Sequence, residues 1–406
     1  MLQNRNKGSL YIIIVAVVLI MSDGIHAQSP DTTSKPKPAE WFRKVNIRGY
    51  AQLRYNRLLE TNPQLGCDQC DKSWGDNNGF FFRRIRIIIF GQIHERVYFY
   101  IQPDFASAPQ SGVLNFGQIR DAYFDVGLDK KNEFRLRIGQ SKVPYGFENL
   151  QSSQNRVPLD RNDALNSAVS NERDIGIFGY WAPTKIRERF SYLVSSGLKG
   201  SGDYGVVGVG VYNGQTANRS ESNDQLHAVA RVSYPFQFGK QFIEPGIQAY
   251  SGKEVVTNVG SGVQGTPGFE YLDRRIAASL IVYPQPFGFA SEMNMGTGPE
   301  YNPETNTIDQ TELSGGYIMG NYMFKRKSHV VVPFVRYHFY DGGKKHELDA
   351  RSYSVRELEV GVEWQPWKAF EVVAMYTMSE RRYEDSVKPQ NEQAGNLLRL
   401  QFQLNF

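Results

Sequence analysis

Side chains that commonly act as nucleophiles or bind metal ions are sparse in this sequence. Its 406 residues include six histidines and two cysteines, and it contains neither a Gly-x-Ser-x-Gly nor a His-Glu-x-x-His motif. Cys67 and Cys70 form a Cys-x-x-Cys pair, but no other cysteine or histidine lies nearby in the sequence to complete a zinc site. In an exported chain such a pair predicts a local disulfide, and the alternative is that it has no role. We therefore expect no enzyme activity and no metal or cofactor.

Charged side chains are abundant, and many of them alternate with apolar ones. In FRLRIG (134–139), Arg135 and Arg137 alternate with Phe, Leu and Ile, and LEVGVEW (358–364) repeats the pattern with glutamates. The chain ends in NLLRLQFQLNF, whose alternating apolar residues continue to Phe406. A period of two is typical of β-strands with one apolar and one polar face. No long stretch shows the period of an amphipathic helix, so we expect an all-β protein.

The alternating segments are long enough to be tilted membrane-spanning strands, which need about 9–11 residues. Seventeen segments qualify: 45–57, 80–94, 97–105, 117–128, 133–142, 173–182, 187–197, 204–213, 225–234, 241–250, 272–283, 287–296, 311–324, 330–340, 353–364, 369–379 and 396–406. The segment 187–197 interrupts an otherwise regular alternation of connection lengths. If it belongs to an enlarged connection, sixteen strands remain, with eighteen as the alternative. An even number is what a bacterial barrel needs to bring both termini to one side.

The connections between these segments run alternately long and short. LLETNPQLGCDQCDKSWGDNNG (58–79) is long and ER (95–96) is short, and near the chain end GTGPEYNPETNTIDQ (296–310) is long and KRKSH (325–329) is short. Bacterial outer-membrane barrels have this asymmetry, with short periplasmic turns and long extracellular loops. The sequence therefore predicts a transmembrane antiparallel β-barrel in the cell outer membrane.

The last strand must pair with the first, because an open sheet in hydrocarbon leaves backbone groups unpaired at a cost of several kcal/mol each. The C-terminal segment suits this role, since one face is apolar and the other polar. Ending on Phe406 also resembles the C-terminal signal by which such barrels are handed to the barrel assembly machinery. The alternative is a soluble β-sandwich that ends in an edge strand, an arrangement that natural proteins usually avoid.

Closure assigns the apolar face of each strand to lipid and the polar face to a lumen, which in a sixteen-stranded barrel is wide enough to hold water. The inward-facing charged residues on this interpretation are Arg48, Arg54, Arg84, Arg86, Arg135, Arg137, Arg231, Arg275, Arg336, Arg399, Asp104, Asp121, Asp125, Glu357, Glu359 and Glu363. We expect them to line a pore. The alternative for each arginine is a solvated wall residue without a role in selectivity.

The segment 144–172, which follows the fifth predicted strand, is the longest connection in the sequence. Loops of this length without structure of their own are usually functional. We expect it to fold into the barrel and narrow a pore that would otherwise leak; the alternative is an extracellular cap. The residues that would then form or border the constriction are Lys142, Arg156, Asp160, Arg161, Asp163 and Glu172.

The N-terminus has the pattern of a secretory signal peptide. Arg5 and Lys7 precede an apolar run from Leu10 to Met21, and a small residue, Ala27, follows. This run is too short to cross about 30 Å of hydrocarbon as a helix. We therefore divide the chain into a cleaved signal peptide (1–27), a flexible periplasmic lead (28–44) and an outer-membrane barrel (45–406). The net charge of +4 is small, so nucleic acid is not an expected partner.

Over nearly its whole mature length the chain resembles the phosphate-selective porin O and P family of Gram-negative bacteria. The motifs that carry the resemblance are GFFFRRIRIIIFGQI (79–93), IQPDF (101–105), IRDAYFDV (119–126), LRIGQSKVPYGFE (136–148), ERDIGIFG (172–179), GVGVYNG (208–214) and ARVSYPF (230–236). The resemblance implies a sixteen-stranded pore, often trimeric, that passes small anions or other solutes. Well-known members carry an arginine ladder and a lysine ring for phosphate, whereas here Lys142 is the only such lysine near the expected constriction.

Together these features predict an outer-membrane porin for passive diffusion of small ions or solutes, with a preference for anions or phosphate. The expected partners are outer-membrane lipid, the barrel assembly machinery, small anions or solutes, and two further copies of the chain in a homotrimer. One alternative is a barrel with a plugged lumen that acts as an adhesin or structural protein. Another is a barrel enzyme, for which His227 and His338 are the only histidines on the lumen face of predicted strands.

Overall fold

The computed structural model describes residues 41–67, 74, 79–107 and 116–406. The predicted signal peptide (1–27) and most of the predicted lead (28–44) lie outside the described residues. Helices in the described part are few and mostly short: η1 (Trp41–Lys44), α2 (Phe147–Leu150), α3 (Asp163–Asn166), η2 (Ser170–Glu172), α4 (Thr184–Ser195), η3 (Pro267–Phe269) and η4 (Leu348–Ala350). The predicted all-β class is therefore confirmed.

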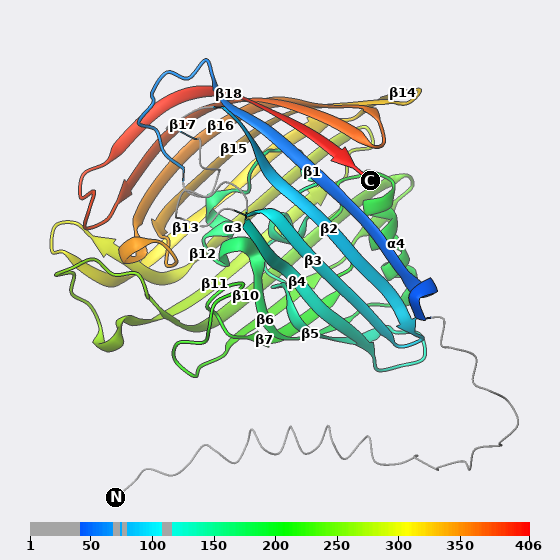
Figure 1. Cartoon of the computed structure of the whole chain (residues 1–406), viewed down its shortest axis with the longest axis horizontal. Coiled ribbons are helices and arrows are strands. Elements are labelled where there is room, and N and C mark those ends of the chain that lie inside the picture. Colours follow the sequence, from blue (N-terminus) through cyan, green and yellow to red (C-terminus); the bar gives the residue numbers. More distant parts are fainter. Residues whose placement is uncertain (1–40, 68–73, 75–78, 108–115) are drawn as a thin grey trace, which may run out of the picture. The chain divides into compact units, whose positions relative to one another are not determined.

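A single antiparallel sheet contains the eighteen described strands (Figure 1). Two of the strands are short continuations of the strand before them. β9 (Phe236–Phe238) continues β8, because both pair with β10, and β14 (Phe324–Arg326) continues β13, because both pair with β15. The other sixteen form the wall and confirm the predicted number. They are β1 (Val45–Leu58), β2 (Phe80–His94), β3 (Val97–Ser107), β4 (Phe116–Gly127), β5 (Phe134–Lys142), β6 (Arg173–Trp181), β7 (Val207–Tyr212), β8 (His227–Ser233), β10 (Gln241–Val255), β11 (Glu270–Val282), β12 (Phe287–Asn302), β13 (Thr307–Tyr322), β15 (His329–Gly343), β16 (Ser352–Trp367), β17 (Phe370–Glu384) and β18 (Glu392–Asn405).

The sheet closes on itself through its first and last strands, which lie side by side in Figure 1. β1 pairs with β18 on one side and with β2 on the other. At the seam, the Gly49 amide donates to the Phe406 carbonyl at 2.8 Å, and the Phe406 amide donates to the Gly49 carbonyl at 3.0 Å. The last residue of the chain is therefore part of the closed hydrogen-bond ladder, as the alternating C-terminal segment predicts.

Side chains alternate between the two faces of the wall. In β18, Arg399, Gln401 and Gln403 are buried in the interior, whereas Leu404 on the opposite face is 51% exposed. Other strands also present large apolar side chains outward, for example Ile247 and Ile318. Apolar residues on the outer face and polar residues on the inner face are the pattern of an outer-membrane barrel. The predicted assignment of the two faces is thus confirmed.

The segment 187–197 is not a wall strand but part of an enlarged connection, as the sixteen-strand interpretation requires: residues 187–195 lie in the helix α4 between β6 and β7. Ile186, Phe190 and Leu193 are buried at a spacing of four and three residues, which places them on one side of a helix. Leu193 packs in a cluster that includes Phe147 and Leu159 of the β5–β6 connection. The short-turn end of the barrel thus contributes a helix to the interior.

No helix in the described part of the chain is long and apolar enough to span a membrane.

The connection predicted as long over 296–310 is a short turn. β12 continues to Asn302 and β13 begins at Thr307, and these two residues pair with each other. The strands therefore extend well past the alternating segments from which they were predicted. Beyond the membrane both faces of a hairpin can meet water, so the apolar–polar alternation that marks a spanning strand is lost there.

Replacing Gly49 with Ala should weaken the closure of the barrel. A Cβ atom at Gly49 would lie 2.5 Å from the Arg86 carbonyl oxygen and 2.5 Å from the Phe406 ring, and the carbonyl belongs to the paired strand β2. Overpacking of this kind typically costs about 1–3 kcal/mol. We expect a lower temperature for the loss of the folded band in heat-modifiability gels. Gly320→Ala is the control, because nothing lies within 4 Å of a Cβ atom there, and equal effects of the two changes would contradict the prediction.

Candidate functional site

Residues 143–172, called the inner loop from here on, connect β5 to β6 and occupy the interior of the barrel. Every residue from Val143 to Leu150 is buried. The Tyr145 ring makes an edge contact with Tyr250 of β10 at 4.8 Å between centroids, and the backbone amides of Phe147 and Glu148 donate to the Glu292 carboxylate of β12 at 2.6 and 2.8 Å. The loop therefore reaches across from β5 and β6 to the far wall.

Asp160 of the inner loop is the main electrostatic link to the wall at the barrel seam. Its carboxylate accepts hydrogen bonds from Arg54 Nη1 of β1 at 3.0 Å and from Arg399 Nη1 of β18 at 2.6 Å. Both arginine side chains are fully buried. Burial alone would raise the pKa of Asp160, but Arg54 and Arg399 outweigh burial and hold the pKa far below its usual range. The carboxylate is therefore ionised and holds the two strands and the loop together.

Two further carboxylates anchor the inner loop to the part of the wall that precedes β18 around the barrel, at β15 and β17. Glu148 accepts from Arg336 Nη1 of β15 at 2.6 Å, and Asp163 accepts from Arg381 Nη2 of β17 at 3.0 Å and from Lys344. Burial opposes ionisation of both acids, yet these cations lower the pKa of each. The inner loop also packs apolar side chains such as Tyr145 and Phe147 into the barrel core, and these ion pairs, which solvent screens little, fix its position.

Most charged residues of the wall pair with a neighbour in the next strand. Directly opposite partners include Arg86 with Asp104 at 2.7 Å and Arg336 with Glu359 at 2.6 Å. The structure places the predicted inward residues on the interior face, and all but Arg48 are buried: Arg54, Arg84, Arg86, Arg135, Arg137, Arg231, Arg275, Arg336, Arg399, Asp104, Asp121, Asp125, Glu357, Glu359 and Glu363. Arg48 is exposed and lies over the Phe90 ring at 5.4 Å.

The residues predicted at the constriction are all buried, but they serve different functions. Asp160 and Asp163 anchor the loop, as described above. Arg161 and Glu172 pair with each other at 2.8 Å, and Arg173 of β6 also donates to Glu172 at 2.6 Å. Burial opposes ionisation of Glu172, but Arg161 and Arg173 hold its pKa below the usual range. These contacts close the inner loop on itself where it returns to the wall.

A few cations of the interior have no carboxylate partner among the described residues. Arg84 of β2 donates to the Gln52 side chain at 2.8 Å, and Arg156 of the inner loop donates to the backbone carbonyls of Pro158 and Leu159. Lys142 likewise donates to two backbone carbonyls of the inner loop, at 2.8 and 2.9 Å. The hydrogen-bonding capacity of these groups is therefore used in part, and none of the three forms a direct ion pair with a carboxylate of the described residues.

Sequence reasoning missed several interior charges. Strict alternation predicts that Asp121 faces inward and that its neighbour Arg120 does not, because it forbids two consecutive inward residues. Both are buried, since a register shift between β3 and β4 at this point turns both side chains inward. Arg381 has the same parity as the buried Thr377 and Ser379 of β17, so continuing the alternation to the end of this strand would have found it. Bulges, by contrast, leave no clear signal in a single sequence.

Cys67 is buried beside Leu65, Trp74 and Leu397. Cys70 lies outside the described residues. The proposed disulfide between these cysteines therefore stays a prediction. The packing of Cys67 shows that the β1–β2 connection contributes apolar side chains to a small core near β18.

One group of buried side chains has the composition of a metal site. His338, Glu357 and Glu359 place a ligand atom each within 4.8 Å of one another. However, Arg381 donates to Glu357 at 2.7 Å and Arg336 donates to Glu359 at 2.6 Å. Two guanidinium groups already neutralise these carboxylates and would repel a cation, so the group does not fit a metal ion.

Replacing Asp160 with Asn should release the inner loop from the seam. The change removes the carboxylate charge that the buried Arg54 and Arg399 share, and breaking a buried ion pair by removing one partner typically costs about 3–5 kcal/mol. We expect faster cleavage by trypsin after Arg156 or Arg161 in the folded protein, read by mass spectrometry. Asp341→Asn is the control, because Asp341 and its partner Arg356 are partly exposed to solvent, which screens their ion pair. Equal cleavage of the two variants would contradict the anchoring role.

Acid should release the same loop. The pKa values of Asp160, Asp163 and Glu172 are lowered in the folded state. Their stabilising effect is therefore complete above the unfolded values of about 4 and is lost progressively as the pH falls from there toward the lower folded-state values. We expect single-channel conductance and its noise to stay constant from neutral pH to about pH 5 and to change below about pH 4. A change centred near neutral pH would contradict this assignment.

Comparison with known proteins agrees with this geometry. The family model of phosphate-selective porin O and P matches residues 59–406. No curated protein matches the chain significantly in sequence. Among solved structures, the outer membrane channel DcaP of Acinetobacter baumannii is similar at 13% identity over 89% of this chain and 97% of that one, with a TM-score of 0.56. OmpF of Salmonella typhi in complex with daunomycin (12%, 89% and 97%, TM-score 0.54) and the trimer form of OmpT of Vibrio cholerae (12%, 89% and 100%, TM-score 0.52) share the fold. The chain thus belongs to the phosphate-selective porin O and P family, and it is a porin of the outer membrane that forms a channel for passive diffusion of small solutes.

Proposed function

We propose that this channel prefers anions, and that Arg84 and Arg156 set the preference where the inner loop narrows the lumen. The observation that carries the proposal is the absence of a carboxylate partner for either guanidinium among the described residues. One group comes from the wall and the other from the inner loop, and both are 4% exposed. They lie close enough together for the two positive charges to repel each other.

The hydrogen bonds of the two side chains support this reading. Arg84 Nε and Arg156 Nη1 are buried without a partner, although buried donors are normally satisfied. Burial and the nearby Arg161 lower the pKa of Arg156, and the Glu148 and Asp160 carboxylates oppose this in part. A guanidinium stays charged in proteins. The site therefore has two charges and two free donors that an anion or a water molecule would satisfy.

The remaining interior charges favour anions only weakly, because most of them cancel in pairs. Lys199, Lys344 and Lys345 are buried, but each pairs with a carboxylate. Arg48 faces water and has no ion pair among the described residues, so it adds to the positive field at the short-turn end. Unpaired buried charges act over longer distances than solvated ones, since little water screens them. We therefore propose a general preference for anions rather than a site built for phosphate.

The proposal also covers the constriction, the pore lining, export and assembly of the chain. The constriction is formed by the inner loop, and the pore-lining residues are those of the interior face. The mature chain begins after a cleaved signal peptide, residues 28–44 form a lead, Phe406 is recognised by the assembly machinery, and the chain functions without catalysis. A homotrimer is supported by the trimer form of OmpT of Vibrio cholerae, which has a similar fold.

Replacing Arg84 or Arg156 with Gln should lower the anion preference. Removing one unit charge at about 4 Å from the ion path is worth about 1 kcal/mol in a water-like medium, or about a fivefold change in the permeability ratio of chloride to potassium. The measurement is the reversal potential in a potassium chloride gradient across a planar bilayer. Lys388→Gln is the control, because it removes an exposed cation outside the lumen. If both arginine variants keep the wild-type reversal potential, these side chains do not set the preference.

A further inference from the structure

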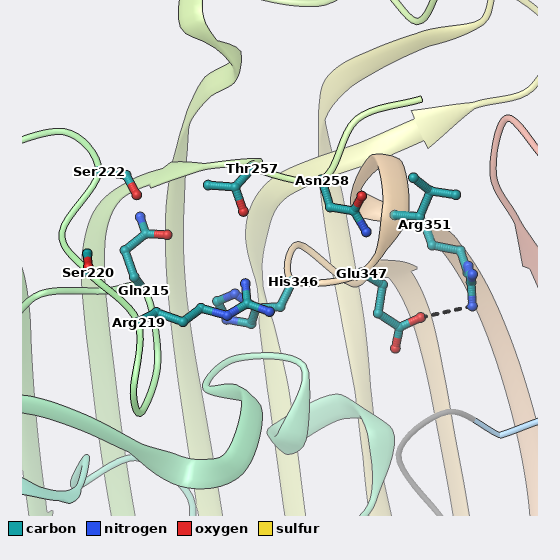
Figure 2. A pocket seen from close by; sticks show the side chains of 10 residues that line it. Gln215, Arg219, Ser220, Ser222, Thr257, Asn258, His346, Glu347 and Arg351 are labelled. Atoms are coloured by element: carbon teal, nitrogen blue, oxygen red, sulfur yellow. Dashed lines mark hydrogen bonds and ion pairs between the residues drawn. The ribbon is translucent and has the colours of Figure 1, made fainter. Parts of the chain in front are cut away.

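A polar pocket lies at the long-loop end of the barrel, which is extracellular in bacterial outer-membrane barrels. It forms where the connections 213–226, 256–269 and 344–351 meet (Figure 2). Its volume of about 660 Å³ lies within the range of about 300–1,000 Å³ typical of small-molecule sites. None of the residues considered above for ion selectivity lines it.

The pocket offers a positive charge and a buried donor. Arg219 is exposed and forms no ion pair among the described residues. Gln215 is 2% exposed, and its Nε2 atom has no hydrogen-bond partner. Both side chains line the pocket, and Figure 2 shows them on the same wall. A buried amide donor without an acceptor is costly, so these two groups together suit the carboxylate of a ligand.

Two acceptors lie further along the same pocket. His346 Nδ1 lies 3.4 Å from the Glu254 carboxylate, and Nε2 is buried without a partner. Burial lowers the pKa of His346, the Glu254 carboxylate opposes this, and Lys345 and Arg219 add to the lowering. The imidazole is therefore neutral, with its proton on the nitrogen that faces Glu254 and a lone pair on Nε2.

Glu347 is the second acceptor. Its carboxylate accepts from the Tyr353 hydroxyl at 2.7 Å and lies 3.3 Å from Arg351 Nη1, the contact drawn in Figure 2. Arg351 is itself shared with Asp385 at 2.7 Å. An imidazole lone pair and a carboxylate both accept hydrogen bonds from hydroxyl groups, and both disfavour a second negative charge on the ligand.

We propose that this pocket binds a small hydroxylated monocarboxylate, such as a sugar acid, at the mouth of the channel. The carboxylate would contact Arg219 and Gln215, and the hydroxyl groups would donate to His346 and Glu347. A neutral sugar leaves Arg219 without a counter-charge, and a phosphate dianion faces Glu347. The delivery of this solute to the lumen rests on the proposed channel function, whereas its binding does not.

The test is isothermal titration of the folded full-length mature protein in detergent with sodium D-galacturonate. We expect saturable binding, and we expect Arg219→Gln to weaken it by about tenfold or more, because hydrogen bonds to charged groups are the strong ones. Gln215→Leu should also weaken binding. Lys388→Gln is the matched control, because it removes one exposed positive charge at the same end of the barrel outside the pocket. Heat-modifiability gels verify that each variant is folded.

D-galactose tests the contribution of the hydroxyl groups and acetate that of the carboxylate. Phosphate tests whether a dianion is accepted in place of a monocarboxylate. All three should bind at least tenfold more weakly than D-galacturonate. The proposal is overturned if D-galacturonate does not bind, if Arg219→Gln binds it as the wild type does, or if acetate or phosphate binds equally well. This assay does not depend on conduction. If D-galacturonate does not bind but Arg84→Gln shifts the reversal potential as expected, the binding pocket is rejected and the proposed anion preference is not affected.

Discussion

The need to pair every backbone hydrogen-bonding group in hydrocarbon governs this structure. A sheet can meet that need only by closing, and a sheet that is antiparallel throughout closes only with an even number of strands whose first and last members fit together. The seam between Gly49 and Phe406 satisfies it with two backbone hydrogen bonds. Once the sheet is closed, alternation directs apolar side chains to lipid and polar side chains inward, so the charged interior is a consequence of the closure.

Closure also creates a problem, because a wide polar interior contains many charges. The chain solves it by bringing opposite charges together: within the wall they pair across adjacent strands, and the inner loop adds carboxylates that meet arginines from several strands. Such buried pairs are weak sources of net stability. Their value here is positional, since Asp160 can be satisfied only where Arg54 and Arg399 converge. The inner loop is therefore held in one position, because moving it would leave buried charges without their partners, which is unfavourable in free energy.

The function proposed for the channel follows from the few charges that this pairing leaves over. Arg84 and Arg156 lie within the interior without an ion pair to any carboxylate of the described residues, and Arg219 lines the pocket at the long-loop end. On this proposal, an anion would meet favourable charge at the entrance and again where the inner loop would narrow the lumen. The family supplies the general function of a porin, and these particular side chains supply its proposed selectivity.

The sequence by itself determined the class of fold, the number of wall strands and the face on which each regular strand residue lies, because period-two alternation follows directly from strand geometry. It assigned 187–197 to an enlarged connection without foreseeing the helix α4, and it misjudged the 296–310 connection, since outside the membrane neither lipid nor closure constrains the pattern. Only the tertiary structure decided which charges are paired. The ladder register set Arg86 opposite Asp104, a bulge turned Arg120 inward, and the path of the inner loop brought Asp160 to Arg399, which lies far away in the chain. Pairing depends on distances across the barrel, and a linear pattern of residues contains no measure of those distances.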